Sequence, residues 1–362
     1  MLSQSTPLSR ESRLPRSLNV IGPVATPPIV LVAFTRPELL QPVLDALAHQ
    51  SVLPTELVAF LDGPRTEQDV PKINACVVLL ETFRTILPVR IIQRPQNLGC
   101  DRNVLLALTE VASQYPSFVY LEDDVVPNPC FYDRISRLLT AYQPHKQVFS
   151  VSAYANYPDE LEADLTEDFM ASNRVFALGF GTWSDRWLAL NLVEMPSDYN
   201  PFQTFAHIPA NLQTKYTIVN QFFIEKNHKV DWVIALTLAA LAKNLIHIIP
   251  KKSFVKNIGC GHPDAKTYRD GVPDWINQRH SLDAVPDSLP ETLEPLNGKS
   301  RSLSGVELIE HFRRSDGLWL NRSALKILLS QYASLDDRRA ICGFFLEQIP
   351  VMVRRRKMKR ET

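Results

Sequence analysis

Short apolar runs alternate with longer amphipathic segments through the first half of the chain, and this alternation constrains the fold more than any other feature. The first run, PIVLVAFTR at residues 28–36, is continuous and β-branched, as in a strand buried on both faces of a parallel sheet. Residues 37–51 follow with helical apolar spacing, although Pro42 weakens the first turn or moves the helix start. We expect further strands at 56–63, 88–94, 117–124, 147–154 and 245–250, and helices at 70–86, 101–115, 131–142 and 230–244.

This order predicts βα units with right-handed crossovers, and therefore an α/β fold with a mostly parallel central sheet flanked by helices. Ligands of such open sheets bind beyond the carboxyl ends of the strands. The first four expected strands all end in polar residues. A binding site is therefore expected at the edge of the sheet where the carboxyl ends of these strands lie. These residues are Thr35 and Arg36, Asp62 and Gly63, Arg94 to Asp101, and Glu122 to Asp124.

Composition excludes several classes of protein. The chain has 362 residues, 45% of them hydrophobic, which is enough for a substantial core. Basic and acidic residues both number 39, so no global basic field favours nucleic acid. The five cysteines are odd in number and form no CxxC pair, which argues against a disulfide framework and a zinc ribbon and favours a reducing cytoplasm. No apolar run approaches the roughly 18 residues of a membrane span.

The stretch FVYLEDDVVPNPC sets three consecutive carboxylates, Glu122, Asp123 and Asp124, against an apolar strand. Adjacent acids repel one another, and leaving them unpaired there costs stability. A divalent cation removes this cost, and Mg²⁺ or Mn²⁺ takes carboxylate, phosphate and water oxygens, so such an acid can bridge to a diphosphate. Glu122 and Asp124 face one side of the strand and Asp123 the other, unless the strand has ended. The alternative is an acidic turn or an N-cap before a helix near Pro129.

The order IVLVAFTR, AFLDG, QNLGCDRN and YLEDDVVPNPCF resembles the nucleotide-diphospho-sugar transferase fold called GT-A. The sequence is most similar to family 2 glycosyltransferases and, in its EDD and SVSAY pieces, to N-acetylglucosaminyltransferase I type enzymes. The resemblance covers residues 28–264. It implies Asp124 as a ligand of Mn²⁺ or Mg²⁺ against the donor diphosphate, and Asp123 and Glu122 as ribose and sugar contacts.

The resemblance also implies donor contacts at the other strand ends. Arg36 would lie by the nucleotide or its phosphates, or be a surface arginine at a helix start. Asp62 would accept a hydrogen bond from the base, or form a turn with Gly63 and Pro64. Asn97 and Gly99 would shape a loop. Asp101 and Arg102 would face the donor sugar or diphosphate, unless Asp101 is a plain N-cap.

Inversion by direct displacement needs one general base for the acceptor hydroxyl, apart from the metal motif. The candidates are Asp231, Asp185 and Glu225. We favour Asp231, because it opens a strongly apolar helix where the resembled enzymes have a catalytic aspartate. The alternative role of Asp231 is an N-cap.

Two later loops are further candidates. FALGFGTWSDRW carries Trp183, whose ring either stacks on a sugar or packs in the core, and Trp187, which we expect in the core. KNIGCGHPDA resembles the closing loop of the family, which implies that Asn257 and His262 reach the diphosphate or the metal. A surface histidine is the alternative for His262.

We therefore expect a metal-dependent inverting glycosyltransferase that moves a sugar from a nucleotide-diphosphate sugar to a glycan or lipid-linked glycan. One rival, a sugar nucleotidyltransferase, needs a glycine-rich loop after its first strand, and AFTRPELL has none. The other rival is a non-catalytic carbohydrate-binding descendant of the fold.

The expected organisation is a disordered leader at 1–26, a GT-A domain at 27–282, a linker at 283–303 and a helical C-terminal extension at 304–362. Within the domain, residues 27–154 form the nucleotide-sugar binding half and 155–282 the acceptor half. The closing run RRRKMKR either touches anionic lipid, as a peripheral contact at the inner face of the membrane, or is a solvated tail. Otherwise we expect a cytoplasmic protein.

Overall fold

The structure is a computed structural model, and it describes residues 15–21, 25–157, 159–194, 232–266, 268–269 and 271–295, with three single positions further on. Asp231, Glu225 and the helical extension expected at 304–362 lie outside the described residues, apart from those single positions. They are Leu335, Arg339 and Leu346.

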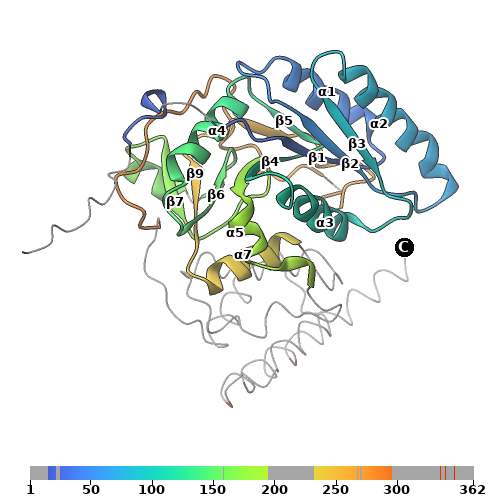
Figure 1. Cartoon of the computed structure of the whole chain (residues 1–362). Helices are drawn as coiled ribbons and strands as arrows, with labels where there is room; N and C mark the ends of the chain where they lie inside the picture. The colour runs from blue at the N-terminus through green and yellow to red at the C-terminus, as the bar shows by residue number, and fades with distance from the viewer. Residues whose placement is uncertain are drawn as a thin grey trace, which may run out of the picture.

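The core of the molecule is an eight-stranded sheet in the order β3-β2-β1-β4-β8-β6-β9-β7 (Figure 1). All of these strands except β7 and β8 run in one direction. The expected α/β fold with a mostly parallel central sheet flanked by helices is confirmed. The strands are β1 Ile29–Ala33, β2 Leu57–Leu61, β3 Val89–Gln93, β4 Ser117–Glu122, β6 Val148–Ser152, β7 Phe169–Ser172, β8 Phe180–Trp183 and β9 Ile246–Pro250.

Helices cover both faces of the sheet and enclose two apolar cores. One core lies under α1, α2 and α4, and the other under α3, α5 and α7. Alternate residues of each strand enter opposite cores, as Ala59 and Phe60 of β2 do, because side chains alternate along a strand. The helices are α1 Pro37–Ala48, α2 Val70–Phe83, α3 Cys100–Ala112, α4 Phe131–Tyr142, α5 Ser184–Leu188 and α7 Trp232–Ala242. None of the described helices is both long and apolar enough to cross a membrane.

Pro42 does not move the start of α1, which begins at Pro37 and runs through Pro42. Proline at the first position costs no hydrogen bond, because that N–H has no partner within a helix. The interior Pro42 removes one bond, but Leu40, Leu44 and Leu47 bury the inner face of the helix in the core.

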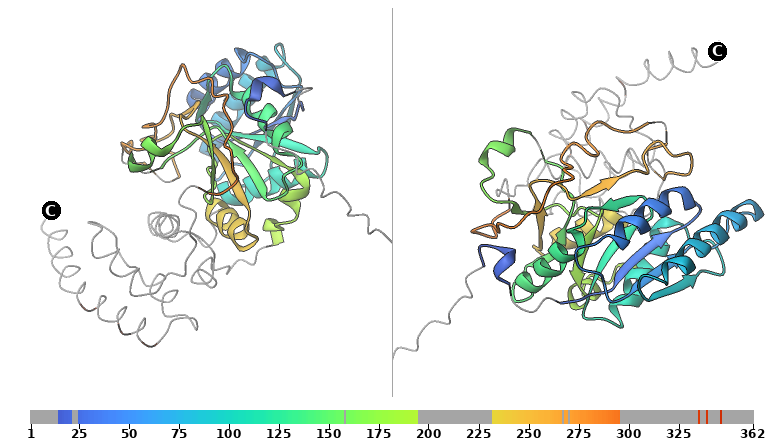
Figure 2. Two further views of the ribbon diagram at one scale, coloured as in Figure 1. Left: turned by 90° about the vertical axis from the view of Figure 1, so that its left-hand side faces the viewer. Right: turned by 90° about the horizontal axis from the view of Figure 1, so that it is seen from above.

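Part of the expected disordered leader is ordered. Leu18 is fully buried in a short 3-10 turn, and its backbone N–H donates to Asp287 at 3.0 Å. The hydroxyl of Ser17 donates to the carboxylate of the same aspartate at 2.6 Å. Figure 2 shows this turn beside the late segment that carries Asp287, so two stretches far apart in the sequence form one surface layer.

The antiparallel strands were not predicted from the sequence. The region of Phe180 to Trp183 was expected as a loop but forms β8, between β4 and β6. A second, two-stranded sheet pairs β5 Val125–Pro127 with β10 Val255–Asn257, directly after the three carboxylates. This second sheet fixes the chain around Asp124.

We predict that Gly181→Ala destabilises the fold by about 1–3 kcal/mol, the usual cost of overpacking a core. A Cβ at this position of β8 would lie 2.8 Å from Cγ2 of Ile135 and 3.0 Å from Cδ1 of Leu139 on α4. Urea unfolding monitored by circular dichroism measures the loss. Gly271→Ala is the matched control, because its Cβ would meet nothing within 4 Å. Equal unfolding midpoints for the two variants would contradict the packing argument.

Candidate functional site

Arg36 joins the carboxylates that follow β4 to the end of β1. Its Nη1 donates to Oδ2 of Asp124 at 2.9 Å, and its Nε and Nη2 both donate to the carboxylate of Asp123. Both aspartates are buried, and such two-pronged, charge-assisted contacts are among the strongest hydrogen bonds in proteins. The structure thus holds the first and fourth strand ends together by one guanidinium.

One guanidinium faces three carboxylates, so negative charge is in excess. Burial opposes the charge on Arg36, but Asp123 and Asp124 outweigh it and raise the pKa of Arg36. Burial, followed by the charge of Asp124, raises the pKa of Glu122 to about 8, although the hydroxyl of Tyr120 donates to it at 2.9 Å. Burial likewise raises the pKa of Asp123 to about 6, against the effect of Arg36. The site therefore favours a further cation.

Asn257 and Gly259 close the other side of Asp124. The amide of Asn257, at the end of β10, makes a long contact of 3.5 Å with Oδ1 of Asp124, and its own oxygen accepts from the N–H groups of Gly259 and Cys260. A Cβ on Gly259 would lie 1.9 Å from Oδ2 of Asp124, so only glycine fits there. Sequence reasoning singled out Asn257 but missed Gly259, whose signal was the paired glycines of NIGCGH.

Asp62 organises the loop after β3. Its two carboxylate oxygens accept from Gly63 N at 2.9 Å, Leu98 N at 2.8 Å, Gly99 N at 2.9 Å and Asn97 Nδ2 at 3.0 Å. A carboxylate offers about four acceptor positions, so all of them are used within the chain. The predicted bond to a nucleotide base would require one of these donors to leave. Asn97 and Gly99 do lie in the loop, and Gly99 has a φ of +78°, which favours glycine.

Asp101 connects the start of α3 to the start of α7. Its Oδ1 accepts from the backbone N–H of Trp232 at 3.0 Å and from Nζ of Lys266 at 2.7 Å. Asp101 thus binds the first residue of α7 and the loop after β10, and it is not a simple cap of α3. Arg102, the next residue, is exposed to solvent on α3.

His262 lies on the rim of the site, against α1. Its Nδ1 accepts from the backbone N–H of Asp264 at 3.0 Å, so Nε2 carries the proton and donates to Glu38 at 2.7 Å. This contact ties the loop after β10 to the first turn of α1. Within the described residues His262 makes no hydrogen bond with Asp124, so the structure does not join it to the candidate metal residue.

Trp183 requires a correction. It lies opposite Ser117, at the amino end of β4, whereas the carboxylates follow the carboxyl end of that strand. Its ring is buried, and Cζ of Arg186 stacks over it at 3.4 Å. The prediction of a sugar contact is therefore wrong, and the core alternative holds. Asp185, an alternative base, lies on the same edge, away from the site, and pairs with Lys146 at 2.7 Å.

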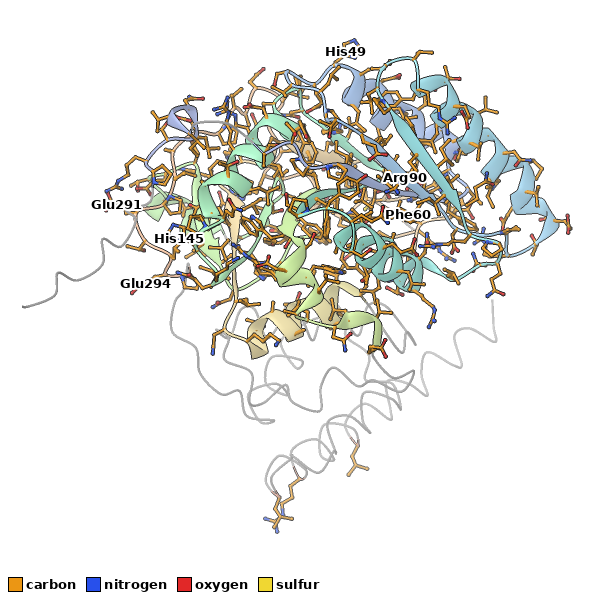
Figure 3. The ribbon with its side chains drawn as sticks, viewed as in Figure 1. His49, Phe60, Arg90, His145, Glu291 and Glu294 are labelled. Carbon is orange, nitrogen blue, oxygen red and sulfur yellow. The ribbon has the colours of Figure 1, made fainter. Side chains whose placement is uncertain are left out.

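A hollow on the opposite flank is separate from the site. Figure 3 labels Glu291 and Glu294 on this flank near β7, away from Phe60 and Arg90 on β2 and β3. Its lining mixes apolar side chains of the edge strand β7, such as Phe169 and Met170, with acidic ones such as Glu291. It shares no lining residue with the cluster around Arg36 and Asp124.

The described residues do not assemble three or more metal-binding side chains in one place. They do fit a cation that takes most of its ligands from a bound diphosphate and water, as Mg²⁺ commonly does. Among the described residues, Oδ1 of Asp124 has only the long contact with Asn257, so it keeps acceptor capacity, and the surrounding charge is negative. Asp124 is the residue that would hold such an ion.

No family model matches the sequence, and no curated protein matches it. Among solved structures, residues 1–349 of TarS from S. aureus share 12% identity at a TM-score of 0.37, over 63% of this chain and 59% of that one. The mannosyltransferase PcManGT from Pyrobaculum calidifontis, in complex with GDP-Man and Mn²⁺, also shares 12% identity at a TM-score of 0.37. The match covers 65% of this chain and 73% of that one.

Glucosyl-3-phosphoglycerate synthase from Mycobacterium tuberculosis, in complex with Mn²⁺ and UDP, gives 13% identity and a TM-score of 0.29, over 44% and 57% of the two chains. This chain spans less than two thirds of the TarS fragment. At these TM-scores the likeness is too distant to carry an argument, and the function proposed below rests on the residues of this chain.

We predict that the free energy of unfolding in metal-free buffer falls as the pH rises from about 4.5 to about 8. The unfolded chain releases the Glu122 proton at the ordinary pKa, whereas the folded chain keeps it until about pH 8, so folding binds a proton in this window. The slope from this one group is at most about 1.4 kcal/mol per pH unit. Urea unfolding across this range measures it. Glu122→Gln is the control, and an unchanged slope in that variant would contradict the assignment.

Proposed function

We propose that this protein is a GT-A glycosyltransferase that transfers a hexose or N-acetylhexosamine from a nucleotide-diphosphate sugar to a carbohydrate, with inversion and with Mn²⁺ or Mg²⁺. The observation that carries the proposal is the pair of buried aspartates at the end of β4, held by Arg36 from the end of β1. Acidic residues at this edge of an α/β sheet lie where ligands bind. The excess negative charge there suits a cation with a diphosphate.

In this proposal Asp124 holds the divalent ion, and Glu122 and Asp123 contact the ribose and the sugar. The ion supplies stabilisation of the negative charge on the leaving diphosphate. Arg36 holds the two aspartates in place, and its remaining N–H groups are available to phosphate oxygens. Asn257 and Gly259 hold the Asp124 carboxylate in one orientation.

Asp231 is the proposed general base for the acceptor hydroxyl. It lies outside the described residues, but the residue after it, Trp232, is tied to Asp101 at 3.0 Å. Asp101 follows the donor loop that Asp62 organises. The start of α7 is therefore fixed relative to the donor side, which suits a base that acts on the acceptor beside the donor sugar.

Two other functions have less support. A sugar nucleotidyltransferase needs backbone donors from a glycine-rich loop after β1, and Arg36 is followed directly by Pro37 at the first position of α1. A non-catalytic carbohydrate-binding protein remains the second candidate, because Arg36 already pairs with the oxygen of Asp124 nearest to it.

The location and the acceptor are proposed on weaker grounds. The described cysteines, Cys76, Cys100, Cys130 and Cys260, are free thiols, in keeping with a cytoplasmic protein. A lipid-linked or capsular glycan is the proposed acceptor. The basic run at 354–360, for which we propose a peripheral contact with anionic lipid, lies outside the described residues.

We predict that one nucleoside diphosphate sugar raises the melting temperature only when Mn²⁺ is present, and that Asp124→Asn abolishes this rise. The variant keeps the shape of the side chain but lacks the charge that holds the ion. Thermal denaturation against UDP, GDP, dTDP and CMP sugars, with and without Mn²⁺, measures the effect. Asp45→Asn on the outer face of α1 is the control. If no nucleotide sugar shifts the wild-type melting temperature, the donor site does not exist.

We predict that Asp231→Asn lowers turnover by about 10²–10⁴-fold and leaves donor affinity unchanged, as expected for the loss of a general base. Donor hydrolysis or transfer assays give kcat, and calorimetry gives the donor Kd. Asp185→Asn is the matched control, because Asp185 lies on the opposite edge of the sheet with Lys146. Comparable turnover in Asp231→Asn and the wild type would remove Asp231 as the base.

A further inference from the structure

Arg174 is a half-buried arginine, and no acid among the described residues pairs with its guanidinium. It follows β7, and its Cζ lies 4.6 Å from the centre of the Phe176 ring. Its backbone N–H donates to Ser172, and within the described residues no carboxylate or carbonyl accepts a hydrogen bond from its guanidinium. Burial lowers the pKa of Arg174 to about 10, and only the hydroxyls of Tyr154 and Tyr268 oppose that shift.

The buried or nearly buried arginines elsewhere in the described structure have acceptors. Arg36 pairs with two aspartates, and Arg279 with Asp159 and Glu162. Arg186 is the closest comparison, because its guanidinium also stacks on an aromatic ring and its pKa is also lowered to about 10. Its guanidinium, however, donates to three backbone carbonyls, those of Tyr142, Gln143 and Val148.

A half-buried guanidinium that an aromatic ring shields on one side, and that has no acceptor among the described residues, is only partly hydrated, so a ligand that supplies acceptors would stabilise it. Tyr154 strengthens this argument. Its ring packs against Phe176 with a centroid distance of 5.5 Å, and its hydroxyl is buried and has no hydrogen-bond partner within the described residues. Two unpartnered donors, one cationic and one neutral, thus flank the same ring.

Tyr154 and Phe176 lie at the edge of the sheet that carries the candidate site, and the guanidinium of Arg174 reaches the Phe176 ring there from the chain after the antiparallel strand β7. Tyr154 follows β6 at its carboxyl end, and the hydroxyl of Ser152 there donates to the carbonyl of Phe176 at 3.3 Å. The loop that begins at Gly259 against Asp124 continues to Tyr268, whose carbonyl accepts from Gly261 at 2.6 Å. The loop therefore spans from the carboxylates to the surroundings of Arg174.

We propose that Arg174, with Tyr154 and Tyr268, forms an anion site that binds a phosphate or carboxylate group of the acceptor. This inference rests on the proposed function, because it treats residues 155–282 as the acceptor side. A planar guanidinium binds either anion with two hydrogen bonds, and a tyrosine hydroxyl adds a third. The acceptor is then an acidic sugar or a phosphate-bearing glycan and not a neutral one.

The test uses the full chain with inorganic phosphate and with glucuronate as probes. Melting temperature is followed at constant ionic strength, in the presence of Mn²⁺ and a saturating nucleoside diphosphate, so that the donor site is filled. Arg174→Gln removes the charge, and Arg84→Gln, an exposed arginine paired with Glu81 on α2, is the matched control. We expect phosphate, glucuronate or both to bind wild type and Arg84→Gln about tenfold or more tightly than Arg174→Gln.

Arg174→Gln is also expected to melt no lower than the wild type without ligand, because it removes a charge that lacks acceptors. Equal binding of both probes to Arg174→Gln and the wild type, or no binding to the wild type, overturns the anion site. Calorimetry of the nucleoside diphosphate is the second measurement. If Arg174→Gln weakens that binding as well, Arg174 serves the donor diphosphate, and the acceptor assignment is wrong. If no nucleoside diphosphate binds the wild type, the proposed function fails, while phosphate titration without nucleotide still decides on Arg174.

Discussion

The contact of Arg36 with Asp123 and Asp124 is the constraint on which the rest of the site depends. Two buried carboxylates next to one another are unstable without a cation, and in the described part of the chain Arg36, just after the neighbouring strand β1, supplies it. The parallel register of β1 and β4 pairs Val32 with Glu122, so the chain continues from both strands to the same level. Pro37 then starts α1 and fixes the backbone of Arg36. The sheet register, the start of α1 and the charge pairing thus all favour the same position of Arg36 beside the two aspartates.

The sequence was most informative where periodicity and burial coincide. The parallel strands and long helices follow from apolar runs and helical spacing, because each is long enough to show its period. The strands β7 and β8 each have only four residues, too few to show alternation. The sequence also does not show in which direction a strand runs, and this explains the error at Trp183. An antiparallel strand reverses which of its ends meets the site, and no property of the residues themselves reports that reversal.

The site shows the same division between residue type and geometry. The polar residues at the strand ends were identifiable from topology alone, because parallel strands deliver their carboxyl ends to one edge. The contacts that each of these residues makes could not be predicted from the sequence. Asp62 looks like a ligand residue in the sequence, yet it accepts four hydrogen bonds from its own chain and shapes the loop of Asn97 and Gly99. Gly259 carries no side chain, and its importance appears only through its distance from Asp124.

Charge is distributed unevenly along this edge of the sheet. On the β4 side, three carboxylates exceed the single guanidinium of Arg36, so the protein lacks positive charge there. Near the end of β6, no carboxylate of the described residues pairs with the guanidinium of Arg174, so this part of the structure lacks negative charge. Each imbalance alone costs folding free energy, and each is relieved by a ligand of opposite sign. A cation with a diphosphate suits the first position and an anionic acceptor the second, and the opposite signs would keep either ligand from occupying the wrong side. Under the proposed function, the stability that the chain forgoes at both positions would be the source of its selectivity for two different ligands.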